Sequence, residues 1–146
     1  MTRLCPSAPA QAPGARVFGV VKQAAGTRRV AYLTLPVAYD EGLEAQLAPL
    51  QPNEVLRTTA PCAEGACQHF DGHDCGLAKR IAASLDPAVE RPPPCAIRRA
   101  CRWWHQEGIA ACLRCPAVLT ASQSEDERFR DAADPLSPAQ VPFSPV

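Results

Sequence analysis

Eight cysteines among 146 residues constrain this chain more than any other feature of its sequence. Seven of them lie between residues 62 and 115, and the eighth lies near the start. Clustered thiols predict either a set of metal ligands or a framework of disulfides. The cysteines follow the patterns C-x4-C-x7-C and C-x5-C-x10-C-x2-C-P.

The start of the chain favours metal ligands over disulfides. The segment MTRLCPSAPAQAPGARV has no apolar h-region, so we expect no secretory signal. No stretch approaches the roughly 20 apolar residues of a membrane span. We therefore expect a cytoplasmic protein without a membrane partner, where reducing pools keep cysteines in the thiol form.

The second half of the pattern predicts one complete four-cysteine site. Its members lie within a short stretch that carries one predicted helix, so we expect them to bind one cofactor. They are Cys95, Cys101, Cys112 and Cys115.

The first half of the pattern predicts a second metal site that lacks one ligand locally. Its three members are Cys62, Cys67 and Cys75. Cys5 supplies the fourth ligand if the N-terminal segment folds back, and His69 or His73 is the alternative.

The spacing favours an iron–sulfur cluster over zinc. Structural zinc usually shows two close C-x2–4-C pairs. Here Cys112 and Cys115 form a short C-x2-C pair, whereas Cys62 and Cys67 are at the wide limit of that spacing. A four-iron cluster accepts irregular spacing because its iron atoms occupy separate corners. The dipeptides Cys5-Pro6 and Cys115-Pro116 also resemble ferredoxin ligand loops. We expect one or two clusters, with zinc as the alternative.

The charges near the last four cysteines fit an anionic cluster. Arginines outnumber acidic residues there, and positive charge stabilises a cluster with four thiolates. A solvated helix face ranks second, and a basic patch with aromatics for nucleic acid ranks third. These arginines are Arg91, Arg98, Arg99, Arg102 and Arg114. Trp103 and Trp104 are adjacent, so at most one of them faces the core squarely.

Hydrophobic periodicity predicts an α+β fold with a β-rich part followed by short helices. The predicted strands are residues 16–21, 29–35 and 54–59, with a polar connection at 22–28. The predicted helices are residues 41–47, 76–85, 96–106 and 110–119. Aromatic residues are only 5% of the chain, so metal cross-links are an expected supplement to a small core.

The organisation follows from these elements. We expect one metal-binding domain over residues 1–120, with its β-rich part at 16–60 and its cysteine-rich helical part at 61–120. Residues 121–146 are acidic and then Pro-rich, so we predict a disordered tail that is dispensable for metal binding.

Function is predicted as electron transfer or metallocofactor assembly for a partner enzyme. The alternative is a zinc-stabilised module that binds protein or nucleic acid. The formal net charge is +0, which gives no support for a nucleic-acid partner. No acid–base pair or nucleophile stands out, so the protein itself is not predicted to be an enzyme.

Two stretches resemble a group of small cysteine-rich bacterial proteins loosely labelled nitrogen fixation proteins. They are APCAEGACQHFDGHDCGLAKRI and PPCAIRRACRWWHQEGIAACLRCPAVLT. The resemblance covers roughly residues 5–120, and the string CRWW-x-QEG-x-x-ACxRCP is unusual. Here Cys115-Pro116 is followed by Ala-Val-Leu, where the group has Gln-Val-Val. The resemblance implies a link to nitrogen fixation and brings no defined activity.

Overall fold

The computed structural model describes residues 2–24, 26–119 and 127–134, and it confirms the predicted α+β class. Its strands are β1 (Leu4–Cys5), β2 (Arg16–Ala24), β3 (Thr27–Ala38) and β4 (Leu56–Pro61). Its α-helices are α1 (Glu41–Leu47), α2 (Pro52–Val55), α3 (Gly76–Ser84), α4 (Arg102–Glu107), α5 (Ile109–Arg114) and α6 (Glu127–Ala133). Short 3-10 helices are Glu64–Ala66, Arg98–Ala100 and Cys115–Ala117.

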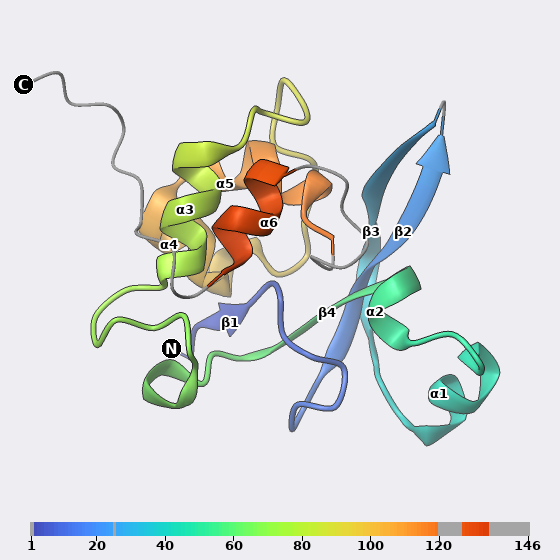
Figure 1. Ribbon diagram of the computed structural model, residues 1–146. Helices are drawn as coiled ribbons and strands as arrows, with labels where there is room; N and C mark the ends of the chain where they lie inside the picture. The colour runs from blue at the N-terminus through green and yellow to red at the C-terminus, as the bar shows by residue number, and fades with distance from the viewer. Residues whose placement is uncertain (1, 25, 120–126, 135–146) are drawn as a thin grey trace, which may run out of the picture.

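The four strands form an antiparallel sheet in the order β1-β4-β2-β3. Helices α3 to α6 gather on one side of the long β2–β3 hairpin, whereas α1 and α2 lie on the other side (Figure 1). The cysteine-rich half of the chain therefore packs as a helical layer beside the β-rich half.

The β2–β3 hairpin is longer than predicted. Lys22 pairs with Arg29 and Ala24 with Thr27, so both strands continue through the segment expected to be a connection. Gly19 allows the strands to approach closely, because a Cβ atom there would lie 2.6 Å from Cγ1 of Val30. The polar residues 22–23 and 27–28 therefore occupy exposed strand positions and not a long loop.

The N-terminal segment folds back onto the sheet, and this strand was not predicted. Leu4 pairs with Pro61 and Cys5 pairs with Ala60. The backbone N–H of Cys62 donates to the carbonyl of Arg3 at 2.9 Å. The predicted third strand begins later than expected, because residues 52–55 form α2 before β4 starts.

Helices α1 and α3 lie where the sequence predicted them. Asp40 caps α1 by accepting the backbone N–H of Leu43 at 2.8 Å, which satisfies one of the unpaired donors of the first turn. The prediction of one continuous helix at 96–106 is wrong, because only its second half is α-helical, in α4. This segment divides into a 3-10 turn and α4, because Cys101 between them is extended, with φ −67° and ψ 124°.

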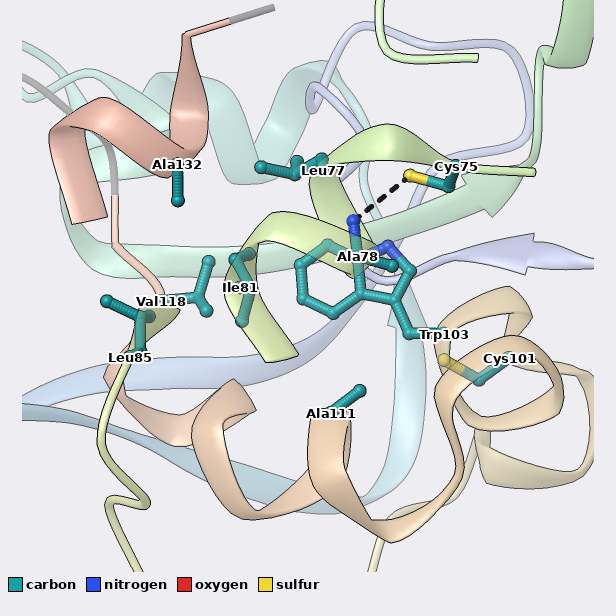
Figure 2. Close-up of a cluster of buried hydrophobic side chains, with 10 residues drawn as sticks. All are labelled: Cys75, Leu77, Ala78, Ile81, Leu85, Cys101, Trp103, Ala111, Val118 and Ala132. Carbon is teal, nitrogen blue, oxygen red and sulfur yellow. Dashed lines mark hydrogen bonds between the residues drawn. The ribbon is translucent and has the colours of Figure 1, made fainter. Parts of the chain in front are cut away.

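A tryptophan occupies the centre of the helical layer (Figure 2). Trp103 is 2% exposed and lies among side chains of α3, α5 and the segment after α5. Large aromatic side chains contribute much of the buried apolar area in a small core. The other members of this core are Cys75, Leu77, Ala78, Ile81, Leu85, Cys101, Ala111, Val118 and Ala132.

Part of the predicted disordered tail is a helix. Helix α6 packs against α3, Ala132 is 2% exposed, and its carbonyl accepts a 2.6 Å hydrogen bond from Nε of Arg80. The prediction of disorder is therefore wrong for residues 127–134. The remainder of the predicted tail, at 121–126 and 135–146, lies outside the described residues.

Among residues 2–24, 26–119 and 127–134, no helix is both long enough and apolar enough to cross a membrane.

Candidate metal centres

The last four cysteines line one cavity. Cys95 follows the proline spacer, Cys101 precedes α4, Cys112 lies on α5, and Cys115 begins the next 3-10 turn. All four contribute to the same cavity wall, which is completed by apolar and aromatic side chains. These include Pro6, Phe18, Tyr32, Ile97, Trp103 and Ala111. We call this set of cysteines the inner group.

Arginine side chains approach the inner group from two elements. Arg98 lines the same cavity. Nη2 of Arg57 lies 3.3 Å from Sγ of Cys115.

Arg57 is the residue of this site that sequence reasoning missed. It lies on β4, is 6% exposed, and uses its guanidinium to bind the backbone around the cavity. Nη1 donates to the carbonyls of Cys115 and Val118, both at 3.0 Å. Nε and Nη2 donate to the carbonyl of Pro6 at 3.0 and 2.6 Å. The sequence signal that could have revealed Arg57 is a charged residue inside a strand with few other charges.

The other four cysteines gather around β1 and the loops that follow β4. The pairing of Cys5 with Ala60 brings this thiol to the end of β4, where Cys62 follows. The loop from Cys67 returns through a β-bridge between Phe70 and Cys75. Burial is the main cause that raises the pKa of Cys5 to about 12, and the thiols of Cys75, Cys62 and Cys67 add to this increase. We call this set the outer group.

The sulfurs of the outer group are also hydrogen-bond acceptors. The backbone N–H groups of Ser7 and His69 lie 3.4 and 3.5 Å from the sulfurs of Cys5 and Cys67. Nε of Arg102 lies 3.2 Å from Sγ of Cys62. Cys75 caps α3 by accepting the backbone N–H of Ala78 at 3.5 Å (Figure 2).

The two histidine alternatives for the fourth ligand are placed differently from Cys5. Nδ1 of His69 is engaged with Nη2 of Arg80 at 2.9 Å. The side chain of His73 is 90% exposed and pairs with Asp74 at 3.2 Å. Of the three candidates for the fourth ligand, Cys5 is the one whose pKa is raised by the other thiols of the outer group.

Burial favours the neutral thiol in most members of both groups. It raises the pKa of Cys5 and of Cys101 to about 12. It also raises the pKa of Cys75, Cys95 and Cys112 above the usual value for a thiol. A metal ion that binds such thiols must displace their protons. Its positive charge then stabilises the thiolates, which burial alone disfavours.

All eight cysteines are free thiols in this structure. Within the described parts of the chain, no three Cys, His, Asp or Glu side chains take the arrangement that holds a single metal ion. Five of the thiols accept a hydrogen bond from a nearby donor.

The basic residues of the cysteine-rich half divide between the two groups. Arg98 lines the cavity of the inner group and lies over the ring of Trp104, with 5.7 Å between Cζ and the centroid. Arg102 contacts the outer group instead. Arg114 donates to the carbonyls of Leu85 and Ala110, so it supports the helices. The arginines that were predicted to surround one cysteine group are therefore divided between the two groups.

Comparisons of the chain with protein-family models, with curated proteins and with solved structures give no match.

Proposed function

We propose that this is a small iron–sulfur protein with a four-iron cluster site in each cysteine group. Its role would be electron transfer, or delivery of a metallocofactor, for a partner protein. The observation that carries the proposal is that the four inner cysteines line one cavity and that five of the eight sulfurs, one in the inner group and four in the outer group, accept hydrogen bonds.

Hydrogen bonds of this kind suit thiolates. A metal-bound cysteine sulfur is anionic and only accepts hydrogen bonds, and donors around it stabilise the charge. A buried free thiol packs as a small hydrophobe and has no need of such donors. Two of the donors are the arginine side chains of Arg57 and Arg102, which add positive charge as well as a hydrogen bond.

The buried Arg57 fits an anionic occupant of the inner site. Its guanidinium is 6% exposed and contacts three carbonyls and one sulfur. Burial of an isolated cation is unfavourable unless an anion compensates it. A cluster with four thiolates supplies that negative charge.

The environment of the inner group favours a cluster over zinc. The cysteines line an apolar cavity with aromatic walls, and Phe18 stacks on Tyr32 with 5.8 Å between ring centroids. Apolar walls exclude water from the sulfurs and tune a redox potential. When bound, a cluster supplies reversible one-electron transfer. The chain's own contribution is to hold the thiolates, balance their charge and keep the site dry.

Metal analysis tests the proposal directly. Protein purified without oxygen should contain iron and acid-labile sulfide in equal amounts, with broad absorption near about 400 nm from thiolate-to-iron charge transfer. Addition of dithionite should bleach this absorption. A colourless protein that carries stoichiometric zinc would contradict the proposal and establish the zinc-stabilised module.

Ligand variants test the assignment of each site. Cys112→Ser and Cys115→Ser should remove the iron of the inner group, whereas Cys5→Ser should remove the iron of the outer group, about half of the total. His73→Ala is the control, because its imidazole is 90% exposed and pairs with Asp74, so this variant should keep all the iron. Full iron in Cys5→Ser with loss in the His69→Ala variant would assign the fourth ligand to the histidine.

A further inference from the structure

The two cysteine groups share the strand β1. Cys5 belongs to the outer group, and its neighbour Leu4 forms a parallel β-bridge with Cys101 of the inner group. The Cα atoms of bridged residues lie about 5 Å apart, and those of consecutive residues about 4 Å apart. The Cα atoms of Cys5 and Cys101 therefore lie within about 9 Å of each other.

Arg102 makes a second connection between the groups. It follows Cys101 directly in the sequence, and its Nε donates to Sγ of Cys62 at 3.2 Å. Its Nη2 is fixed by Glu64 at 3.0 Å, and its guanidinium lies over the ring of Phe70 at 5.4 Å. One residue and one hydrogen bond therefore join a cysteine of the inner group to a sulfur of the outer group.

Arg57 makes a third connection. Its guanidinium binds the carbonyl of Pro6, the residue after Cys5, and the sulfur of Cys115. Both Cys-Pro dipeptides of the chain thus contact the same buried cation. The three connections come from different elements, namely β1, α4 and β4.

We propose that the two sites act as one electron relay, joined by β1, Arg57 and Arg102. This inference rests on the proposed iron–sulfur function. One electron enters at one site from a one-electron donor protein, and the site is reduced. The same electron then passes to the other site and leaves to a one-electron acceptor protein, so no proton or bond is consumed.

Separation decides whether such a relay works. Electron tunnelling weakens exponentially with distance, so two sites whose ligands lie on adjoining residues exchange electrons far faster than either exchanges with a distant partner. Fixed donors also matter, because arginine hydrogen bonds to sulfur raise the potential of the site that receives them. Each site has its own arginine, Arg57 or Arg102, so the two potentials are set separately.

Stepwise reduction of the full-length protein, followed by electron paramagnetic resonance, tests the relay. A four-iron cluster in the oxidised resting state has no net spin, and the one-electron-reduced state has one. At low extents of reduction we expect a narrow signal from one reduced site. At full reduction with a strong reductant such as titanium(III) citrate, we expect a broadened or split signal because two nearby spins interact.

Each outcome is decisive for one of the two proposals. A fully reduced spectrum that is the simple sum of two isolated signals would contradict the relay and leave the iron–sulfur function intact. The same holds if only one site ever accepts an electron. Absence of iron from the anaerobic protein would overturn the proposed function itself, and the relay with it.

A variant of Arg102 tests the connection separately. Arg102→Gln should lower the midpoint potential of the outer site, because the sulfur of Cys62 loses a charged donor. Arg99→Gln is the matched control, since Arg99 is an exposed neighbour on the same segment. Equal potentials in the two variants, with iron content unchanged, would show that Arg102 has no electrostatic role.

Discussion

Nη2 of Arg57 lies 3.3 Å from Sγ of Cys115, and this contact pairs a buried cation with a sulfur in place of a carboxylate. By contrast, His73, Lys79 and Arg102 form ion pairs with carboxylates. Burial lowers the pKa of the Arg57 guanidinium, but the nearby Cys115 raises it and the raising effects prevail. A negative charge at Cys115 therefore stabilises the charged form of Arg57.

Replacement of this cation should destabilise the protein. Arg57→Gln leaves buried carbonyls of Pro6, Cys115 and Val118 without their donors, and an unsatisfied buried polar group costs about 1–3 kcal/mol. We expect a loss of that size in the free energy of unfolding, measured by urea denaturation under anaerobic conditions. Arg57→Lys should not restore it, because a single ammonium does not reproduce the planar guanidinium.

Arg29→Gln is the control for this experiment. Arg29 lies on β3 of the same sheet, is exposed and donates to the carbonyl of its neighbour Arg28. It should unfold like the unchanged protein. Equal stability of the Arg57→Gln and Arg29→Gln variants would show that the buried guanidinium is not a structural requirement.

The two adjacent tryptophans should differ sharply in their effect on stability. Trp103 is 2% exposed at the centre of the helical layer, so Trp103→Ala should cost about 3–5 kcal/mol of unfolding free energy. Trp104 is partly buried and lies over Arg98, a cation–π contact worth about 0.5–1 kcal/mol. Trp104→Phe should therefore be nearly neutral and keep its metal. Urea denaturation of both variants measures the difference, and similar losses would place both rings in the core.

Sequence patterns within a short segment predicted the elements that are stabilised by residues of the same segment. The α1 helix carries its own cap at Asp40, and the apolar spacing of residues 76–85 produces α3, so both could be inferred from the sequence. The grouping of the inner cysteines was likewise inferred from sequence proximity, and these residues do line one cavity.

Features that depend on distant contacts escaped prediction. The strand β1 has two residues and exists because β4 pairs with it across more than fifty positions. Cys101 interrupts a helical pattern because its backbone also pairs with Leu4. Arg57 is buried by segments at both ends of the chain, so neither its neighbours nor its strand position revealed its role.

The turn between Cys67 and Cys75 should depend on Asp71. Its Oδ1 accepts the backbone N–H groups of His73 at 2.9 Å and Asp74 at 2.7 Å, which lower the pKa of its carboxyl to about 2. Because the pKa is lower in the folded state, the carboxylate stabilises the turn above 3.8, the ordinary pKa of an aspartate side chain. That stabilisation is lost as the pH falls from there towards 2.

Asp71→Ala should therefore speed amide hydrogen exchange at residues 73 and 74 at neutral pH, measured by NMR. Asp71→Asn retains a side-chain oxygen acceptor and should have an intermediate effect. Asp40→Ala is the control, because it removes a cap from α1 and should leave exchange in the turn unchanged. Unaltered exchange in Asp71→Ala would mean that the glycine-containing turn is stable without the carboxylate.

Helix α6 should contribute to stability, in contrast to the rest of the segment predicted as a tail. A chain that ends after Thr120 loses the packing of Ala132 on α3 and the acceptor of Arg80 Nε. Leaving that buried donor unpaired should cost about 1–3 kcal/mol in unfolding free energy. A chain that ends after Asp134 keeps both contacts and should match the full-length protein in urea denaturation.

The substitution Ala132→Glu separates loss of the helix from loss of chain length. It introduces a carboxylate at a position that is 2% exposed. It should therefore destabilise the full-length protein about as much as ending the chain after Thr120 does. Cys75 caps α3, the helix that α6 covers. The chain that ends after Thr120 should therefore also release the iron of the outer group to a chelator more easily. Equal stability and equal chelation rates in both truncated proteins would show that α6 is dispensable, as the sequence alone had suggested.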